Sequence, residues 1–244
     1  MRNVIVTGGS RGLGLGIARR LSGTGFRVLA VARKHNEQLT EQMRQANLIN
    51  PGSFHFVPFD LAEYEKIADL VRTLKKEFGH IYGLVNNAGI SFDGLLSALP
   101  TDHIEQMIRL NTVSPIVLTK YVVRSMLANG EGRIVNIASI TASSGFSGLS
   151  VYSATKASML GFSRSLAREI GSAGINVNSV APGFVDTDMT SGVKDEHRQK
   201  IERRSALRRL VDIEDVADAV EFLLSDKSKN ITGTVLTVDA GSTA

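Results

Sequence analysis

Tyr152 and Lys156 are the two side chains whose types and spacing most directly suggest chemistry. On a helix, residues four apart share one face, so the Lys156 ammonium would lie beside the Tyr152 phenol. A neighbouring positive charge favours the phenolate and lowers a phenol pKa that is ordinarily near 10. Such a tyrosine could give a proton to a carbonyl oxygen or take one from an alcohol. Ser139, thirteen residues earlier, could hold the same substrate oxygen.

This pair is weak evidence by itself, because an exposed helix often carries tyrosine and lysine at this spacing with no chemistry attached. Its meaning depends on the elements that position it. Short β-branched runs predict strands at residues 3–6, 27–32, 54–59, 82–86, 133–138, 176–180 and 234–238. Apolar periodicity predicts helices near residues 15–23, 36–47, 63–78, 101–128, 152–171 and 213–225. The alternation predicts an α/β fold around a mostly parallel sheet, and we expect residues 1–244 to form one domain.

A glycine-rich turn follows the first predicted strand and opens a helix. Glycines at positions 8, 12 and 14 would let the backbone approach a pyrophosphate, which the free N–H groups of the helix N-terminus would bind. The G-x-x-x-G-x-G spacing differs from the commoner G-x-G-x-x-G, so its position after a strand carries the prediction. A purely structural turn is the alternative. The predicted dinucleotide contacts in this turn are Gly8, Ser10, Arg11, Gly12, Leu13 and Gly14.

The residues after the second strand bear on the choice of dinucleotide. An NAD enzyme usually has an acidic residue there, on the ribose 2′-hydroxyl. This chain has Ala32 and then Arg33, with Arg11 in the glycine turn. Two guanidinium groups and no carboxylate suit a 2′-phosphate, so we expect NADP(H). The alternative is that Arg33 is a solvated loop cation.

Further cofactor contacts are expected after the third, fourth and sixth strands, where ligands bind in open α/β sheets. Asp60 could accept a hydrogen bond from the adenine amino group or could instead cap the helix near residue 63. Thr187 is placed to meet the nicotinamide carboxamide. The full set of expected contacts in these segments is Asp60, Leu61, Asn87, Ala88, Gly89, Pro182, Gly183, Val185 and Thr187.

Composition narrows the possible classes of protein. The 43% apolar and 21% charged content is ordinary for a globular domain, and the absence of cysteine excludes disulfides and thiolate metal sites. The five histidines have no pair at ligand spacing, so we expect no metal. No apolar run approaches the length of a membrane span and no leader pattern is evident, so we expect a cytoplasmic protein. Nucleic-acid binding is not expected, since no reading motif accompanies the net charge of +4.

Taken together, these motifs resemble those of the short-chain dehydrogenase/reductases over essentially the whole chain. The matching residues are Thr7 to Gly14, the Asn-Asn-Ala-Gly run 86–89, Asn111, Ser139, Tyr152, Lys156 and Pro182-Gly183, in the family's order and spacing. Within the family the chain looks most like the 3-oxoacyl-(acyl-carrier-protein) reductases, through the runs 87–90, 161–169 and 181–190.

The resemblance implies a fold and a mechanism. The fold would be a single-domain, Rossmann-type, doubly wound sheet of seven parallel strands in the order 3-2-1-4-5-6-7. Tyr152 would be the general acid, Lys156 would lower its pKa and bind the nicotinamide ribose, Ser139 would orient the carbonyl, and Asn111 would hold a relay water. Helices 101–128 and 152–171 would form dimer contacts within a homotetramer.

The implied reaction is NADPH-dependent reduction of a carbonyl, in a 3-oxoacyl thioester or similar ketone, to a secondary alcohol. The thioester could be carried by acyl-carrier protein or by coenzyme A. One alternative is a broader ketone reductase or alcohol dehydrogenase acting on free hydrophobic substrates. Another is a non-catalytic NADP(H)-binding module, although such proteins generally lack the tyrosine or lysine present here.

Several departures from the family pattern bear on the substrate. Basic residues expected for carrier docking are missing from residues 127–131 and 171–174. Phe146 and Leu149 replace the usual polar residues, which predicts an apolar mouth to a pocket formed by Ser139, Phe146, Leu149, Tyr152 and Phe184. Residues of about 184–210 would form a lid over that pocket. This segment contains a basic run, 198–209, that could meet an acidic carrier or a coenzyme A phosphate, or could simply be a solvated helix face. The C-terminal residues 238–244 also depart from the usual Asp/Asn-Gly-Gly.

Overall fold

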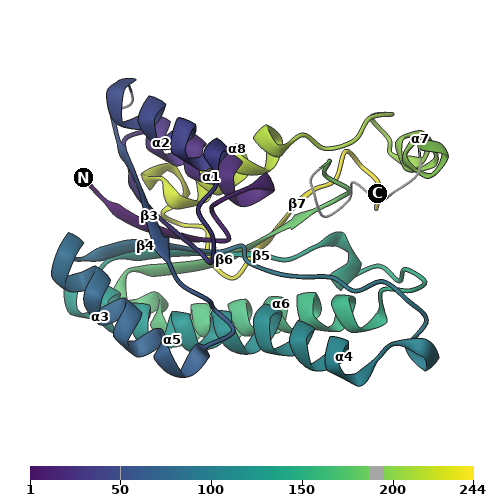
Figure 1. Cartoon of the computed structure of the whole chain (residues 1–244), viewed down its shortest axis with the longest axis horizontal. Helices are drawn as coiled ribbons and strands as arrows, with labels where there is room; N and C mark the ends of the chain where they lie inside the picture. Colours follow the sequence, from purple (N-terminus) through teal and green to yellow (C-terminus); the bar gives the residue numbers. More distant parts are fainter. Residues whose placement is uncertain (50, 187–194) are drawn as a thin grey trace.

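A seven-stranded, entirely parallel sheet forms the centre of the computed structural model, which describes residues 1–49, 51–186 and 195–244 (Figure 1). The strands are β1 (Asn3–Thr7), β2 (Arg27–Ala32), β3 (Ser53–Pro58), β4 (Ile81–Asn86), β5 (Gly132–Ile137), β6 (Ile175–Pro182) and β7 (Val235–Val238). Their order across the sheet is β3-β2-β1-β4-β5-β6-β7. The sequence prediction of strand positions, parallel pairing and order is confirmed.

Two layers of helices cover the sheet. Helices α1 (Gly12–Gly23), α2 (Glu37–Ile49) and α8 (Ile213–Leu224) lie on one face in Figure 1. Helices α3 (Ile67–Phe78), α4 (Thr101–Ile108), α5 (Ser114–Asn129) and α6 (Ser150–Ile170) lie on the other. Helix α7 (Asp195–Arg204) stands apart, beyond the ends toward which β6 and β7 run.

Each apolar strand contributes side chains to the hydrophobic cores on both faces of the sheet, because successive side chains of a strand point to opposite faces. Val4 and Val6 of β1 belong to the core under α1 and α8, whereas Ile5 between them belongs to the core under α3, α5 and α6. In β2, Val28 and Leu29 divide in the same way. All five of these side chains have no exposed surface. The continuously apolar sequence of the strands is thus explained by burial on both faces.

The single helix predicted for residues 101–128 is wrong in one respect, because the structure divides it. Helices α4 and α5 are joined by a π-turn over Arg109–Val113. Pro115, near the start of α5, has no N–H to offer the carbonyl of Asn111 four residues earlier, and its ring crowds that carbonyl. The regular α-helical bonding therefore fails at this point, and Asn111 lies in the wider turn.

The helix α7 was not among the elements predicted from apolar periodicity, because its sequence is almost entirely polar. It contains the first part of the basic run noted above, residues 198–204. Across the described parts of the chain, no helix combines the length and the apolar character that a bilayer crossing requires.

Candidate active site

The carboxyl ends of β1, β4, β5 and β6 bring the predicted site residues to one edge of the sheet. Strands β2 and β3 lie on one side of β1, and β4 to β7 lie on the other. The strand order therefore reverses between the neighbouring strands β1 and β4. Ligands of open α/β sheets bind at such a switch point. The turn after β1, the segment after β4 and the residues after β5 all meet there.

The glycine turn after β1 is shaped as a cradle without side chains. Gly8 and Gly12 have positive φ angles of 67° and 51°, which side chains disfavour. A Cβ on Gly14 would lie 2.2 Å from the Gly8 carbonyl oxygen, so only glycine fits there. Helix α1 begins at Gly12, and the side chain of its N-cap residue, Arg11, makes no capping hydrogen bond to the first N–H groups. These open donors and the helix dipole suit a pyrophosphate.

Thr7, the last residue of β1, holds the cradle against the segment after β4. Its Oγ1 accepts hydrogen bonds from the backbone N–H groups of Asn87 (2.9 Å) and Ala88 (3.0 Å). The Asn87 side-chain amide donates in return to the Thr7 carbonyl oxygen (2.8 Å). Thr7 was not among the predicted site residues. Its hydroxyl at the strand end, next to the glycine motif, was the signal that could have identified it.

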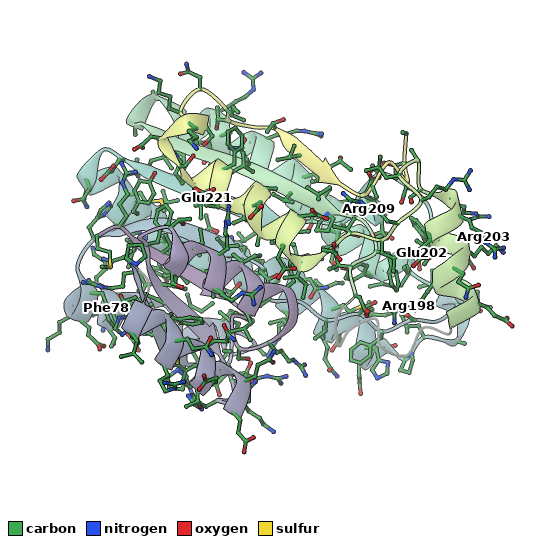
Figure 2. All side chains as sticks on the ribbon, turned by 90° about the horizontal axis from the view of Figure 1, so that it is seen from above. Phe78, Arg198, Glu202, Arg203, Arg209 and Glu221 are labelled. Atoms are coloured by element: carbon green, nitrogen blue, oxygen red, sulfur yellow. The ribbon has the colours of Figure 1, made fainter. Side chains whose placement is uncertain are left out.

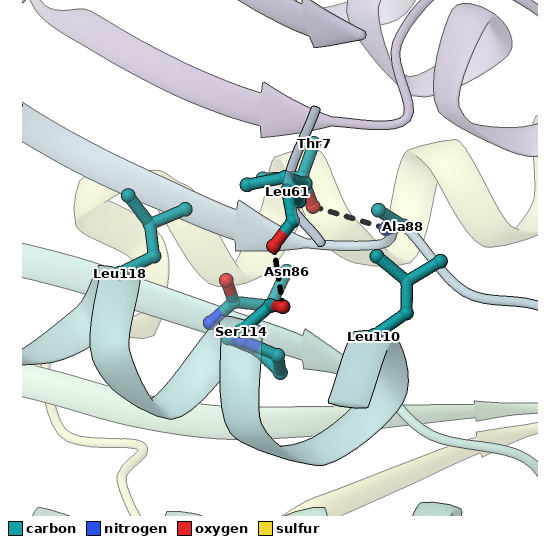
Figure 3. Close-up of a pocket in the computed structure, with 8 residues that line it drawn as sticks. Thr7, Leu61, Asn86, Ala88, Leu110, Ser114 and Leu118 are labelled. Atoms are coloured by element: carbon teal, nitrogen blue, oxygen red, sulfur yellow. Dashed lines mark hydrogen bonds between the residues drawn. The ribbon is translucent and has the colours of Figure 1, made fainter. Parts of the chain in front are cut away.

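A small cavity lies beside Thr7 and Leu61 (Figure 3). Its volume of about 10 Å³ is room for about one water molecule, so it is not a substrate site. The Ser114 hydroxyl donates to the Leu61 carbonyl oxygen (2.6 Å), which fixes the segment after β3 against the start of α5 (Figure 3). Leu61, predicted to contact the cofactor, is held in place by this bond.

The segment after β2 lies next to the glycine turn. The Asn36 side-chain amide donates to the Ser10 carbonyl oxygen (2.9 Å), and its Oδ1 accepts from the Leu39 N–H at the start of α2 (2.7 Å). Arg11 and Arg33 are both exposed at this edge, and residues 32–36 contain no carboxylate. The structure thus places the two predicted 2′-phosphate contacts on segments joined by Asn36.

Asp60 makes a local bond at the end of β3. Its Oδ1 accepts from the Ala62 N–H (2.9 Å) in a local turn. The helical turns that follow have Glu63 and Lys66 at their N-caps, so the predicted capping role of Asp60 is wrong. Pro182 and Gly183 follow β6, and a Cβ on Gly183 would lie 2.9 Å from the Asp239 Cα, so the backbones of these segments are in contact. Val185 pairs with Val211 in a short parallel bridge. Thr187 lies outside the described residues, as does part of the expected lid.

Tyr152, Ser139 and Lys156 are brought together by α6 and the segment after β5. Tyr152 is in the first turn of α6, and the Ser139 hydroxyl is near enough to its phenol to lower the phenol pKa. Lys156 follows one turn later, with its Nζ 5.7 Å from the centre of the Tyr152 ring. The ammonium donates to the Ile137 carbonyl oxygen at the end of β5 (2.9 Å).

The pKa values differ from the expectation that Lys156 lowers the pKa of Tyr152. The pKa of Tyr152 is raised to about 12, chiefly by burial; the Ser139 hydroxyl lowers it and the nearby carboxylate of Asp93 raises it. Burial also lowers the pKa of Lys156 to about 8. Desolvation disfavours the charged form of each group, and the lysine is bonded to a backbone carbonyl rather than to the phenol.

Asn111 is buried in the π-turn and fixes the segment after β4. Its Oδ1 accepts from the Ile90 N–H (2.9 Å), and its Nδ2 donates to the Ile90 carbonyl oxygen (2.8 Å) and to Thr155 Oγ1 (3.1 Å). A Cβ on Gly89 would lie 3.2 Å from Asn111 Oδ1 and 3.5 Å from Lys156 Nζ. Gly89, Asn111 and Lys156 therefore lie together in the structure, from three separate elements.

The rim next to Tyr152 is apolar and is formed by two loops. The Gly94 N–H donates to the Gly148 carbonyl oxygen (2.9 Å), which joins the loop after β4 to the loop before α6. Phe146 is 45% exposed, and Leu149 and Phe184 are partly buried. Sequence reasoning missed Leu95 and Leu96, which are 64% and 60% exposed in the first of these loops, and Asp93 beside them.

This chain is similar to known proteins over nearly its whole length. The family model described as enoyl-(acyl carrier protein) reductase matches residues 8–243. The chain is 38% identical over 238 residues to the 3-oxoacyl-(acyl-carrier-protein) reductase of Escherichia coli strain K12, covering 97% of this chain and 95% of that protein. It is 40% identical over 237 residues to the reductase of the same name from Haemophilus influenzae, covering 97% and 96%. It is 39% identical over 236 residues to the human 3-oxoacyl-(acyl-carrier-protein) reductase, covering 97% of this chain and 95% of that protein.

A solved structure is similar over the same extent. The short-chain type dehydrogenase/reductase from Mycobacterium ulcerans matches with a TM-score of 0.93 at 29% identity. The match covers 99% of this chain and 89% of that one. The sheet and its helices thus have the same overall architecture as that protein.

Proposed function

Because this chain belongs to the short-chain dehydrogenase/reductase family and is closely related to its 3-oxoacyl-(acyl-carrier-protein) reductases, we propose that it reduces the ketone of a 3-oxoacyl thioester to a secondary alcohol with NADPH. The observation that carries the proposal is the meeting of Ser139, Tyr152, Lys156 and Asn111 beside the glycine cradle. The side-chain-free turn and the open N-terminus of α1 fit a dinucleotide pyrophosphate.

Tyr152 is the proposed general acid. A phenol with a pKa of about 12 is fully protonated at neutral pH, so it is ready to give a proton to the carbonyl oxygen. The Ser139 hydroxyl, which lies near that phenol, orients the same substrate oxygen. The cofactor supplies the hydride when it is bound, and the protein supplies position and electrostatics.

Lys156 is proposed to stabilise the phenolate that Tyr152 becomes as it gives up its proton. With a pKa of about 8, its amine is mostly protonated at neutral pH but loses its proton easily. It can therefore act as a positive charge beside Tyr152 and bind ribose hydroxyls. Asn111, bonded to the backbone of Ile90 and to Thr155, positions the segment after β4. Its further proposed role is to hold a water that extends a proton relay from Lys156.

The preference for NADPH is proposed from Arg11, Arg33 and the lack of a carboxylate at residues 32–36. Replacing Arg33 by aspartate should lower kcat/KM for NADPH by about tenfold or more and leave that for NADH equal or higher, because a carboxylate repels a 2′-phosphate and accepts from a 2′-hydroxyl. Steady-state kinetics with both cofactors measure this. Equal use of NADH and NADPH by the unsubstituted enzyme would refute the NADPH assignment.

The exposed apolar rim favours a second candidate, a ketone reductase or alcohol dehydrogenase acting on free hydrophobic substrates. Phe146, Leu95 and Leu96 would contact an apolar chain at the mouth. Values of kcat/KM for an acyl-carrier-protein thioester, acetoacetyl-coenzyme A and a bulky free ketone discriminate the two. Faster turnover of the free ketone would replace the thioester assignment.

We also propose that residues 184–210 cover the substrate mouth, and that the enzyme is a homotetramer with α4, α5 and α6 in subunit contacts. The support for the lid is that α7 stands beyond the strand ends and is attached to the segment after β6 by an ion pair between Arg198 and Asp186. Light scattering on the purified protein measures the subunit number, and a monomer in solution would refute the assembly.

A further inference from the structure

The positive charge of this protein is concentrated in one short segment. Residues 198–209 contain six lysine and arginine residues and one carboxylate, a net charge of +5. The whole chain has a net charge of +4, so the remaining residues together are slightly acidic. A field confined to one segment steers a ligand of opposite charge to that segment.

Helix α7 divides its residues between two faces. At 100° per residue, one face of the helical spiral carries Arg198, Ile201, Glu202 and Ser205. This face is turned toward the rest of the molecule. Arg198 is paired with Asp186, and Ser205 is 1% exposed. Figure 2 shows Glu202 and Arg198 on the side of α7 toward the body of the molecule and Arg203 on the opposite side.

The opposite face carries cations. Lys200, Arg203 and Arg204 fall within about 100° of one another on this face, and all three are exposed. Arg208 and Arg209 continue the exposed cations in the turn that follows. We call these five residues the α7 basic face: Lys200, Arg203, Arg204, Arg208 and Arg209.

Within the described part of the chain, no carboxylate forms an ion pair with a member of the α7 basic face. Glu196 lies one turn before Lys200 on the same side of α7. Its negative charge offsets that of Lys200 in part, so the positive charge of the α7 basic face is least offset at the arginines. Arg203 and Arg204 lie in the last turn of α7, where positive charges interact favourably with the helix dipole. Helix stability alone could therefore explain these two arginines. That reason does not extend to Arg209, which is beyond the helix.

The α7 basic face is held in a defined position. The Ser205 hydroxyl accepts from the Arg209 N–H (3.1 Å) and bonds to the Arg209 carbonyl oxygen (2.9 Å), which closes the turn after α7. The Leu207 N–H donates to the Ala240 carbonyl oxygen after β7 (3.0 Å). The cations therefore stand next to the carboxyl edge of the sheet, where the candidate active site lies.

We propose, on the premise of the proposed function, that the α7 basic face docks the acidic surface of an acyl-carrier protein whose thioester enters the site. Charge complementarity selects the occupant, because an uncompensated row of cations beside the site attracts an acidic surface. Lys200 to Arg204 extend over about 6 Å of the α7 axis, and Arg208 and Arg209 continue the charge beyond the helix. Five cations spread over a helix and the turn that follows suit several carboxylates on a protein surface.

The test uses the intact enzyme with Arg203→Glu/Arg204→Glu, compared with Lys75→Glu/Lys76→Glu. Both pairs are exposed and lie in the last turn of a helix, so both variants change the net charge and the helix dipole alike. The control pair is at the end of α3. Binding of the holo-carrier protein is measured by calorimetry, and kcat/KM is measured with acetoacetyl-carrier protein, acetoacetyl-coenzyme A and the uncharged acetoacetyl-N-acetylcysteamine.

We expect the arginine variant to lose about tenfold or more in carrier affinity and in kcat/KM for the carrier thioester, with less salt dependence than the parent enzyme. The ratio of kcat/KM for the carrier thioester to kcat/KM for the uncharged thioester should fall about tenfold in the arginine variant, because any effect on the lid changes both values alike. The lysine variant should resemble the parent in every assay. Unchanged carrier binding in the arginine variant, or an equal loss in the lysine variant, overturns the docking proposal. An equal loss with coenzyme A overturns the assignment to a carrier protein. A parent enzyme inactive on all three thioesters refutes the proposed function, whereas carrier binding still tests the docking face.

Discussion

Replacing Lys156 by methionine separates the electrostatic cost of its buried ammonium from the packing of its side chain. The lysine is 5% exposed, and burial lowers its pKa from 10.5 to about 8. This difference corresponds to about 3 kcal/mol by which the folded protein prefers the neutral amine more than the unfolded chain does. Methionine has a similar length and no charge, so it removes this cost.

The sign of the effect follows from proton binding. Between about pH 8 and pH 10.5 the unfolded chain keeps the Lys156 proton while the folded protein loses it. Stability rises with pH wherever the unfolded state binds more protons. The parent enzyme should therefore gain about 2–3 kcal/mol from this group between about pH 7 and pH 10, a gain that Lys156→Met lacks. The lost bond to the Ile137 carbonyl oxygen destabilises the variant at every pH, so it does not affect the slope.

Urea unfolding at several pH values, at fixed protein concentration, measures these free energies. All other titrating groups are common to both proteins, so the difference between the two curves isolates Lys156. Lys76→Met, at an exposed site, is the control and should run parallel to the parent. Parallel curves for Lys156→Met and the parent would show that the ammonium has no desolvation cost in the folded state, and the reasoning about its pKa would be refuted.

Three further outcomes follow from the structure. Asp93→Asn should lower the pKa of Tyr152, because a nearby negative charge is removed. The rate of alcohol oxidation should then rise at lower pH than in the parent, and an unchanged pH–rate profile contradicts this. Ala240→Gly should raise the free energy of unfolding by roughly 0.5 kcal/mol, since Ala240 has a φ of 55° that glycine adopts without steric cost; chemical denaturation that shows a loss refutes it. The rate of carbonyl reduction should fall above about pH 8 as Lys156 loses its proton; a rate independent of pH up to about 10 speaks against that role.

Much of the fold was predictable because burial on two faces leaves a simple pattern. Strands such as β1 and β2 are continuously apolar, and the glycine turn follows β1 directly, so both could be identified from the sequence. The helix α7 could not, since its stability comes from anchoring contacts such as Arg198 with Asp186 rather than from an apolar stripe. The division of α4 from α5 was readable in principle from Pro115.

The candidate site was predictable in its residue types but not in its electrostatics. The spacing of Tyr152 and Lys156 indicates that they share a helix face, and the structure has them on α6. Spacing says nothing about desolvation, which raises the pKa of Tyr152 instead of lowering it. The clamp that Thr7 forms with Asn87 depends on strand ends that meet only in the folded sheet.

The central claim is that Tyr152 donates the proton in an NADPH-dependent reduction of a 3-oxoacyl thioester. The most direct test is the loss of NADPH absorbance with acetoacetyl-coenzyme A, for the parent enzyme and Tyr152→Phe, with NADPH affinity measured by fluorescence. We predict rapid turnover by the parent, a loss of about 100-fold or more in kcat for the variant, and nearly equal cofactor affinity. Turnover by Tyr152→Phe equal to that of the parent would contradict the account.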